Sequence, residues 1–74
     1  MPRTIEVKAD VTGSVWQIEI AIGSTVAADD CIMLIESMKM EIPVLAPAAG
    51  VLAEVRHAKG DAVAEGDVVA IIHG

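Results

Sequence analysis

A single lysine lies between two methionines in the triplet Met38-Lys39-Met40. The amine of a lysine can be acylated, which removes its charge and extends the side chain. Methionines on both sides offer soft, adaptable apolar surface for contacts with more than one partner protein. Glu36 and Ser37 precede the triplet and Glu41 follows it, and we expect the two carboxylates to help orient a basic partner. We therefore expect Lys39 to carry the chemistry, with the residues around it as the recognition context.

The triplet lies at the junction between two similar halves of the chain. A shift of 37 residues places residues 4–36 over residues 41–73 without a gap, and ten of the 33 pairs are identical. The tetrapeptide Ser37 to Met40 alone falls between the halves. A pseudo-two-fold fold would place this tetrapeptide on its axis and both chain ends at the opposite pole. Lys39 would then project where nothing crowds it.

Apolar and polar residues alternate along most of the chain, and the period of two is typical of strands. No window has the length and rhythm of a helix, and glycines such as Gly23 and Gly60 mark turns. We predict an all-β fold, a flattened antiparallel barrel-sandwich of two four-stranded sheets with an internal pseudo-two-fold repeat and one shared core. The expected strands lie near residues 3–8, 14–21, 25–27, 31–36, 40–45, 51–57, 62–64 and 67–72.

The turn that carries the lysine has an unusual composition. Tight hairpin turns favour Asn, Asp or Gly because their geometry requires positive φ. Met38 and Lys39 depart from that preference. Departures of this kind in an otherwise consistent sequence concentrate at functional sites. The composition of the turn therefore supports a role for Lys39 in function.

Size and charge exclude several classes of protein. Seventy-four residues predict one domain, 1–74, which we expect to be monomeric, and a single cysteine rules out an internal disulfide. A net charge of −6 and one aromatic residue argue against nucleic acid as a partner.

No apolar run is long enough to span a membrane, and the N-terminal residues lack the pattern of an export sequence. Cys31, expected to be a small buried hydrophobe, suits a reducing compartment, so we expect the cytoplasm.

Other candidate residues are assigned structural roles. His57 and His73 are isolated from further ligands, so we expect no metal site. The serines lack the strand-turn-helix elbow of a catalytic serine, so we expect no catalytic residue. Met33 should belong to the core. Trp16 is expected to be half-buried near a sheet edge, with exposure as a docking anchor as the alternative.

The segment ESMKM followed by EIPVLAPAAGV resembles the biotinyl domain of biotin-dependent carboxylases, whose hallmark is a lysine between two methionines at a hairpin tip. The segments GSVWQIEIAIGSTVAADDCIMLIESMKM and AAGVLAEVRHAKGDAVAEGDVVAII extend the resemblance over essentially the whole chain. The resemblance implies that a biotin protein ligase attaches biotin to Lys39 through an amide bond. Ser37 stands where many members have Ala, and it adds only a hydroxyl at a position expected to be exposed. The chain has no room for the inserted loop that touches biotin in well-known bacterial carriers.

The resemblance also implies a function, that of a biotin carboxyl carrier that is not itself a catalyst. A biotin carboxylase would carboxylate the biotin with ATP and bicarbonate. A carboxyltransferase would then pass the carboxyl group to an acceptor, and the chain would shuttle between the two.

Two alternatives to the biotin carrier stay open. A lipoyl carrier has a similar fold and a hairpin lysine, but its family usually places Asp before the lysine and Ala after it, so the methionines favour biotin. An unmodified adaptor module is the other alternative, and modification of Lys39 would separate it from both carriers. The sequence also leaves open the carboxyl acceptor, which could be an acyl-CoA, a 2-oxo acid or a small amide. It leaves open whether the chain belongs to a larger subunit.

Overall fold

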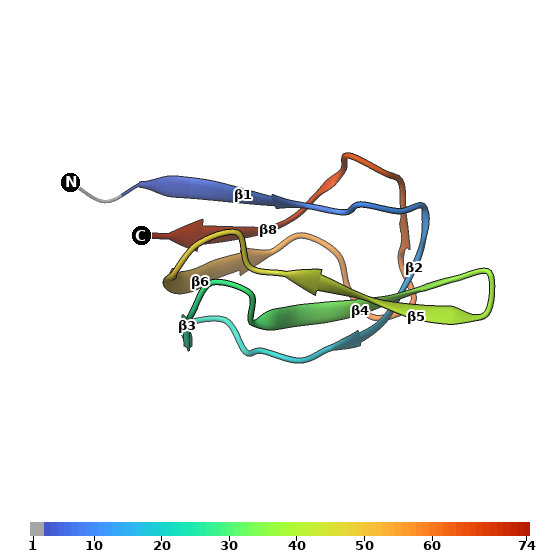
Figure 1. Ribbon diagram of the computed structural model, residues 1–74, viewed down its shortest axis with the longest axis horizontal. Helices are drawn as coiled ribbons and strands as arrows, with labels where there is room; N and C mark the ends of the chain where they lie inside the picture. Colours follow the sequence, from blue (N-terminus) through green and yellow to red (C-terminus); the bar gives the residue numbers. More distant parts are fainter. Residues whose placement is uncertain (1–2) are drawn as a thin grey trace.

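The computed structural model describes residues 3–74, which form eight strands and no helix (Figure 1). The predicted all-β fold is therefore confirmed. The strands are β1 Thr4–Lys8, β2 Gly13–Ile18, β3 Thr25–Val26, β4 Cys31–Ser37, β5 Met40–Leu45, β6 Gly50–Val55, β7 Ala62–Val63 and β8 Val68–His73.

The strands form two four-stranded antiparallel sheets, ordered β1-β8-β6-β3 and β5-β4-β2-β7. Each sheet takes two strands from the first half of the chain and two from the second. The predicted sandwich of two four-stranded sheets is confirmed. Because each sheet needs strands from both halves, neither half can complete a sheet without the other.

The strands β2 and β6 end earlier than the sequence predicts, at Ile18 and Val55. The chain must leave one sheet after each of these strands to form the next strand in the other sheet. One backbone bond continues each pairing, from Glu19 N to Ile32 O at 2.9 Å and from Arg56 N to Val69 O at 2.8 Å. The crossing between sheets therefore shortens strands that their composition would prolong.

The internal repeat includes irregular features as well as strands. The register between β1 and β8 shifts by one residue, so Val69 in β8 has no direct partner. The register between β4 and β5 shifts in the same way, and Ile32 in β4 has no direct partner. Trp16 and Ala53 are a second pair of such bulge residues, in β2 and β6. Each pair is separated by the repeat distance of 37 residues. The structure therefore has the expected pseudo-two-fold symmetry.

The position of the hairpin tip corrects one expectation. Arg3 and Gly74 exchange two backbone hydrogen bonds of 2.9 Å, and they are the repeat equivalents of Met40 and Ser37, which pair beside the tip. The symmetry thus exchanges the tip with the chain ends, and the expectation that the tetrapeptide lies on the axis is wrong. The expectation of opposite poles is confirmed, because the tip and the ends lie at opposite ends of a molecule measuring 39 × 19 × 18 Å (Figure 1).

Aliphatic side chains from both sheets fill the space between them. Met33 is fully buried, as predicted, and no polar side chain is buried among residues 3–74. The largest fully buried side chains are Ile32, Met33, Ile35, Leu52, Ile72, Val7, Val15, Val26 and Val69. Burial of this aliphatic surface is the main source of stability in a chain of this size.

Cys31 is half-buried rather than buried, because it faces Leu45 across the register of β4 and β5, outside the core. Burial raises the pKa of its thiol, and the nearby Glu19 carboxylate raises this pKa further.

Trp16 is 39% exposed and lies beyond the two residues of β2 that pair with β7. Its expected position near a sheet edge is confirmed, but the side chain is exposed rather than half-buried, in line with the alternative expectation.

Glycine is required at the start of β2 and β6 because backbones approach closely there. A Cβ atom on Gly13 would collide with the carbonyl oxygen of Glu36. A Cβ atom on Gly50 would lie 2.5 Å from the carbonyl oxygen of His73 and 2.6 Å from Cγ2 of Ile72. The first contact joins β2 to β4 within the first half of the chain, and the second joins β6 to β8 within the second half. Small size at these two positions therefore permits the central strands of each sheet to pair.

We predict that Gly50→Ala lowers the free energy of unfolding by at least about 2 kcal/mol, because the methyl group forces the β6 and β8 backbones apart. The matched control is Gly23→Ala, where an added Cβ meets nothing but φ is +94°. The control should cost about 1 kcal/mol, through backbone strain alone. Urea denaturation of both variants measures the difference. An equal or smaller loss for Gly50→Ala would contradict the role assigned to close approach.

Candidate functional site

The candidate site is the tip of the β4–β5 hairpin. Ser37 pairs with Met40, which leaves a two-residue turn made of Met38 and Lys39. Both turn residues have positive φ, 53° for Met38 and 67° for Lys39. A residue with a Cβ loses about 1–2 kcal/mol in this region relative to a right-handed conformation. The predicted departure from turn preferences is thus confirmed as local backbone strain.

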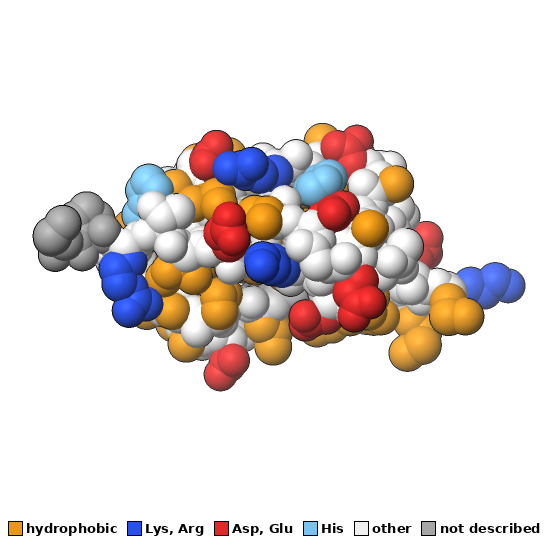
Figure 2. All heavy atoms as spheres, turned by 90° about the horizontal axis from the view of Figure 1, so that it is seen from above, with side chains coloured by type: hydrophobic (Ala, Val, Ile, Leu, Met, Phe, Trp, Pro, Cys, Tyr) orange, Lys and Arg blue, Asp and Glu red, His pale blue; other side chains and the backbone are white. Residues whose placement is uncertain are grey.

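The side chains of the tip are open to solvent. Met38 is 93% exposed, Met40 is 63% exposed, and Lys39 is also exposed. The expected exposure of both methionines is therefore confirmed. The right-hand end of Figure 2 shows the tip projecting from the body, with a basic group beside hydrophobic side chains. The amine of Lys39 is accessible to a large partner without any unfolding of the domain.

Ser37 anchors the base of the hairpin. Its hydroxyl donates a hydrogen bond of 2.8 Å to the carbonyl oxygen of Thr12. The Thr12 hydroxyl accepts a 3.1 Å bond from the backbone N–H of Glu65. Ser37 is half-buried, which corrects the expectation of an exposed hydroxyl. The three residues join the hairpin to the loops before β2 and after β7, so Ser37 positions the tip.

Two carboxylates face each other just below the tip. Glu36 and Glu41 are direct partners across β4 and β5, and both are exposed. Like charges in this arrangement destabilise a strand pair, typically by a few tenths of a kcal/mol. Together they give the base of the tip a negative potential on the side that lies away from the core. The structure therefore brings Glu36 and Glu41, both singled out from the sequence, onto one surface below Lys39.

The remaining polar candidates are not brought together. His57 and His73 lie outside the hairpin, and residues 3–74 contain no group of three side chains suited to hold a metal. Nδ1 of His57 is buried and has no hydrogen-bond partner. The accessible amine of the hairpin therefore has the two carboxylates below it but no histidine, and residues 3–74 provide no metal site beside it.

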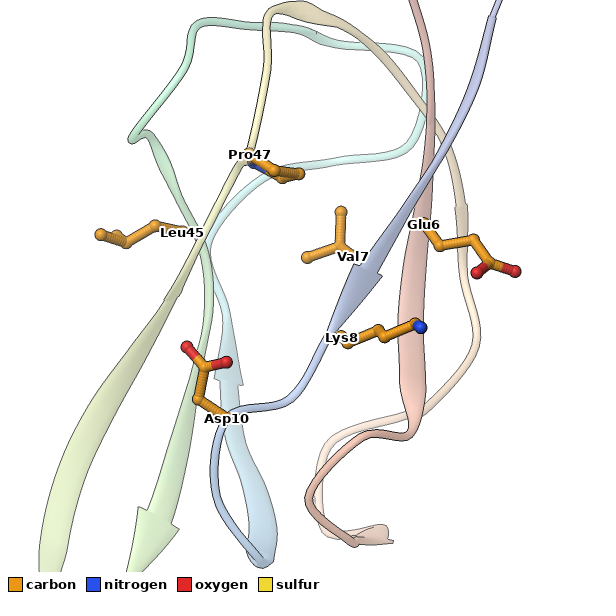
Figure 3. A pocket seen from close by; sticks show the side chains of 6 residues that line it. All are labelled: Glu6, Val7, Lys8, Asp10, Leu45 and Pro47. Atoms are coloured by element: carbon orange, nitrogen blue, oxygen red, sulfur yellow. The ribbon is translucent and has the colours of Figure 1, made fainter.

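A shallow groove of about 250 Å³ lies between the edge strands β1 and β5, lined in part by Val7, Leu45 and Pro47 (Figure 3). Leu45 and Met40 are at opposite ends of β5. At about 3.3 Å per residue the groove is roughly 15 Å or more from the tip. The groove is therefore separate from the candidate site.

Comparison with known proteins agrees with the fold and identifies the family. The family model described as "Biotin-requiring enzyme" matches residues 1–72. The chain is 40% identical over 67 residues to the biotinylated protein TB7.3 homolog of Mycobacterium leprae, covering 90% of this chain and 94% of that one. It is 36% identical over 63 residues to the biotin/lipoyl attachment protein of Bacillus subtilis, covering 85% and 86%.

Solved structures show the same arrangement of strands. The urea carboxylase of Kluyveromyces lactis matches with a TM-score of 0.91 and 36% identity, over 95% of this chain and 6% of that one. The lipoyl domain of the 2-oxoglutarate dehydrogenase complex from Azotobacter vinelandii matches with a TM-score of 0.70 and 28% identity, over 89% and 94%. The chain belongs to the biotin/lipoyl attachment family and is related to the biotin carrier domains of carboxylases.

Membership in this family defines the general character of the protein. It is a carrier domain, not catalytic by itself, and biotin is the cofactor of the family. Within residues 3–74 the structure has no helix that is long and apolar enough to cross a membrane.

We predict that Lys39→Gly raises the free energy of unfolding by roughly 0.5–1 kcal/mol, because glycine adopts the positive φ of 67° without strain. Lys39→Arg is the matched control, since arginine keeps both the Cβ and the charge. Its stability should equal that of the unsubstituted chain. Chemical denaturation measures both. Destabilisation by Lys39→Gly would show that the lysine side chain supports the fold, contrary to the exposed tip.

We predict that Ser37→Ala costs about 1 kcal/mol, because it removes the hydrogen bond to Thr12 and leaves a carbonyl oxygen without that partner. Amide hydrogen exchange should also become faster at the tip than in the core. Ser24→Ala is a comparison at another half-buried serine, for which the structure gives no side-chain hydrogen bond. Unchanged exchange at the tip in Ser37→Ala would contradict the anchoring role of this hydroxyl.

Proposed function

We propose that residues 1–74 form a single biotinyl domain that acts as a biotin carboxyl carrier, with biotin attached to Lys39. The observation that carries the proposal is the exposed position of Lys39, in a two-residue turn with Met38 and next to Met40. The similarity to a biotinylated protein at 40% identity and to a urea carboxylase adds support.

The residues of the tip fit covalent attachment. Amide formation needs a carboxyl group activated with ATP, which the ligase supplies, and an accessible primary amine that displaces the activating group. Lys39 supplies this amine on a hairpin that is anchored at its base by Ser37. The ligase forms an amide between this amine and the carboxyl group of biotin, so the charge of the lysine is lost. When attached, biotin supplies the nitrogen that accepts and releases the carboxyl group. Met38 and Met40 provide adaptable apolar contacts next to the arm in each partner.

The proposed partners are a biotin protein ligase, a biotin carboxylase and a carboxyltransferase. Relatives of this chain within biotin-dependent carboxylases support the two carboxylase components. The domain is proposed to act as a monomer in the cytoplasm, without a nucleic-acid or membrane partner. The acidic composition, with 11 acidic and 5 basic residues, supports the exclusion of nucleic acid.

A lipoyl carrier is the second candidate function. The similarity to a lipoyl domain, with a TM-score of 0.70, favours it. The methionine on each side of Lys39 favours biotin, because lipoyl domains usually have Asp and Ala at these positions. We therefore rank the biotin carrier first.

The proposal predicts one biotinyl addition to the unsubstituted chain after incubation with a biotin protein ligase, ATP and biotin. Peptide mapping should place the addition on Lys39. Lys39→Arg should gain no mass, whereas Lys59→Arg, at an exposed lysine in another turn, should still gain one biotin. Intact-mass spectrometry reads all three. A chain that accepts lipoate but not biotin would establish the second candidate, and biotin on a lysine other than Lys39 would refute the site.

A further inference from the structure

The two outer faces of the sandwich differ, although the repeat makes their strands equivalent. Val7 and Val44 point into the core, so their strand neighbours point away from it. On β1 these neighbours are Glu6 and Lys8, and on β5 they are Pro43 and Leu45. Figure 3 shows Leu45 directed away from Val7, and the side of the molecule seen in Figure 2 mixes acidic and basic side chains. At equivalent positions, therefore, the outer face of the sheet that carries Lys39 has apolar residues where the outer face of the other sheet has charged ones.

The bulge in β2 adds an aromatic residue to the apolar face. Trp16 and Gln17 together oppose Leu34, and the equivalent positions in the other sheet are Ala53 and Glu54. A bulge places two successive side chains on one side of a strand, so Trp16 faces outward with Gln17. At 39% exposure, Trp16 lies in solvent where the other sheet has a small alanine.

The outward residues form a continuous surface, here called the β5–β4–β2 patch. The register pairs Leu34 with Pro43 and Cys31 with Leu45, and Trp16 lies beside Leu34. Leu45 is 46% exposed, Pro43 is exposed, and Leu34 and Cys31 are half-buried. Contiguous exposed apolar surface on a small domain marks an interaction site, and tryptophan is enriched among the residues that dominate binding energy.

Charge around the patch defines the chemistry of its occupant. The strands β2, β4 and β5 contain no Lys, Arg or His. Glu36 and Glu41 flank the patch near the tip, and Glu19 lies close enough to Cys31 to raise its pKa. If two copies of the chain paired through this patch, the carboxylates of one copy would face those of the other, and their repulsion would disfavour the dimer. The rim therefore favours a partner with apolar surface bordered by Lys and Arg.

We propose that the β5–β4–β2 patch docks the biotin protein ligase, an inference that rests on the proposed function. The ligase meets an unmodified domain, so its affinity must come from protein surface. A stable interface buries about 800 Å² on each partner, more than a three-residue tip provides. Leu34 and Pro43 are three residues from Ser37 and Met40, roughly 10 Å along the strands. A ligase that covers Lys39 therefore reaches the patch.

The repeat supplies substitutions that suit the fold. Trp16→Ala and Leu45→Lys each introduce the residue found at the equivalent position in the other half, Ala53 and Lys8. The control is Val51→Ser, which removes a 41% exposed apolar residue from the opposite outer face and introduces the residue found at position 14. Circular dichroism and denaturation establish that all three variants are folded. If either patch variant is not folded, Pro43→Glu is used in its place, because it introduces the residue found at the equivalent position 6.

The experiment is steady-state biotinylation by a bacterial ligase, with chain concentration varied. We expect Trp16→Ala to raise KM about 10-fold with kcat within about 2-fold, as loss of a major binding residue requires. Leu45→Lys should also raise KM, because it places a cation against a basic rim. Val51→Ser should leave both constants unchanged.

Four outcomes would overturn the docking surface. Equal KM values for the patch variants and the unsubstituted chain would exclude a ligase contact. Slower carboxylation of the biotinylated Trp16→Ala chain by a biotin carboxylase, with normal ligation, would assign the patch to that component instead. Self-association that Trp16→Ala abolishes would assign it to a second copy. A ligase that fails to modify the unsubstituted chain would refute the proposed function together with the docking surface, so the two failures are distinguishable.

Discussion

The structure depends on the assembly of each sheet from both halves of the chain. The strands β1 and β3 join β6 and β8, while β5 and β7 join β2 and β4, so the aliphatic core forms only when the halves come together. Close approach at Gly13 and Gly50 permits the central pairs β2–β4 and β6–β8 to form within each half, since any side chain there meets a carbonyl oxygen of the opposing strand. The same topology leaves one hairpin, β4–β5, to project from the pole opposite the chain ends (Figure 1).

The rigidity of this assembly allows strain at the tip. Positive φ at Met38 and Lys39 would be avoided in a free hairpin, where asparagine and glycine are preferred. Here β4 lies between β5 and β2, and Ser37 bonds to Thr12, so the turn is held from both sides. The cost of the strain is offset by burial elsewhere in the core. The result is an amine presented on a fixed support, which suits a carrier whose partners must find the same group in turn.

Much of this architecture follows from the sequence because its determinants are local or repeated. Period-two alternation indicates the strands, the repeat indicates two equivalent halves, and Met-Lys in a tight turn indicates positive φ. The bond between Ser37 and Thr12 joins residues 25 positions apart, and only the packed structure brings them together. The bulge at Trp16 interrupts the period of two, so the sequence does not reveal the face on which this side chain lies. The repeat does not predict the position of the tip correctly. The two-fold operation exchanges the junction between the halves with the chain ends, so this junction does not lie on the axis.

The central claim is that Lys39 carries a carboxyl group between partners. The most direct test incubates the biotinylated chain with a biotin carboxylase, ATP and radiolabelled bicarbonate, and then separates the protein from free label. The account predicts label on the biotinylated chain, none on the unmodified chain and none on Lys39→Arg, followed by its loss when a carboxyltransferase and its acceptor are added. A biotinylated chain that takes up no label from an active carboxylase would contradict the account.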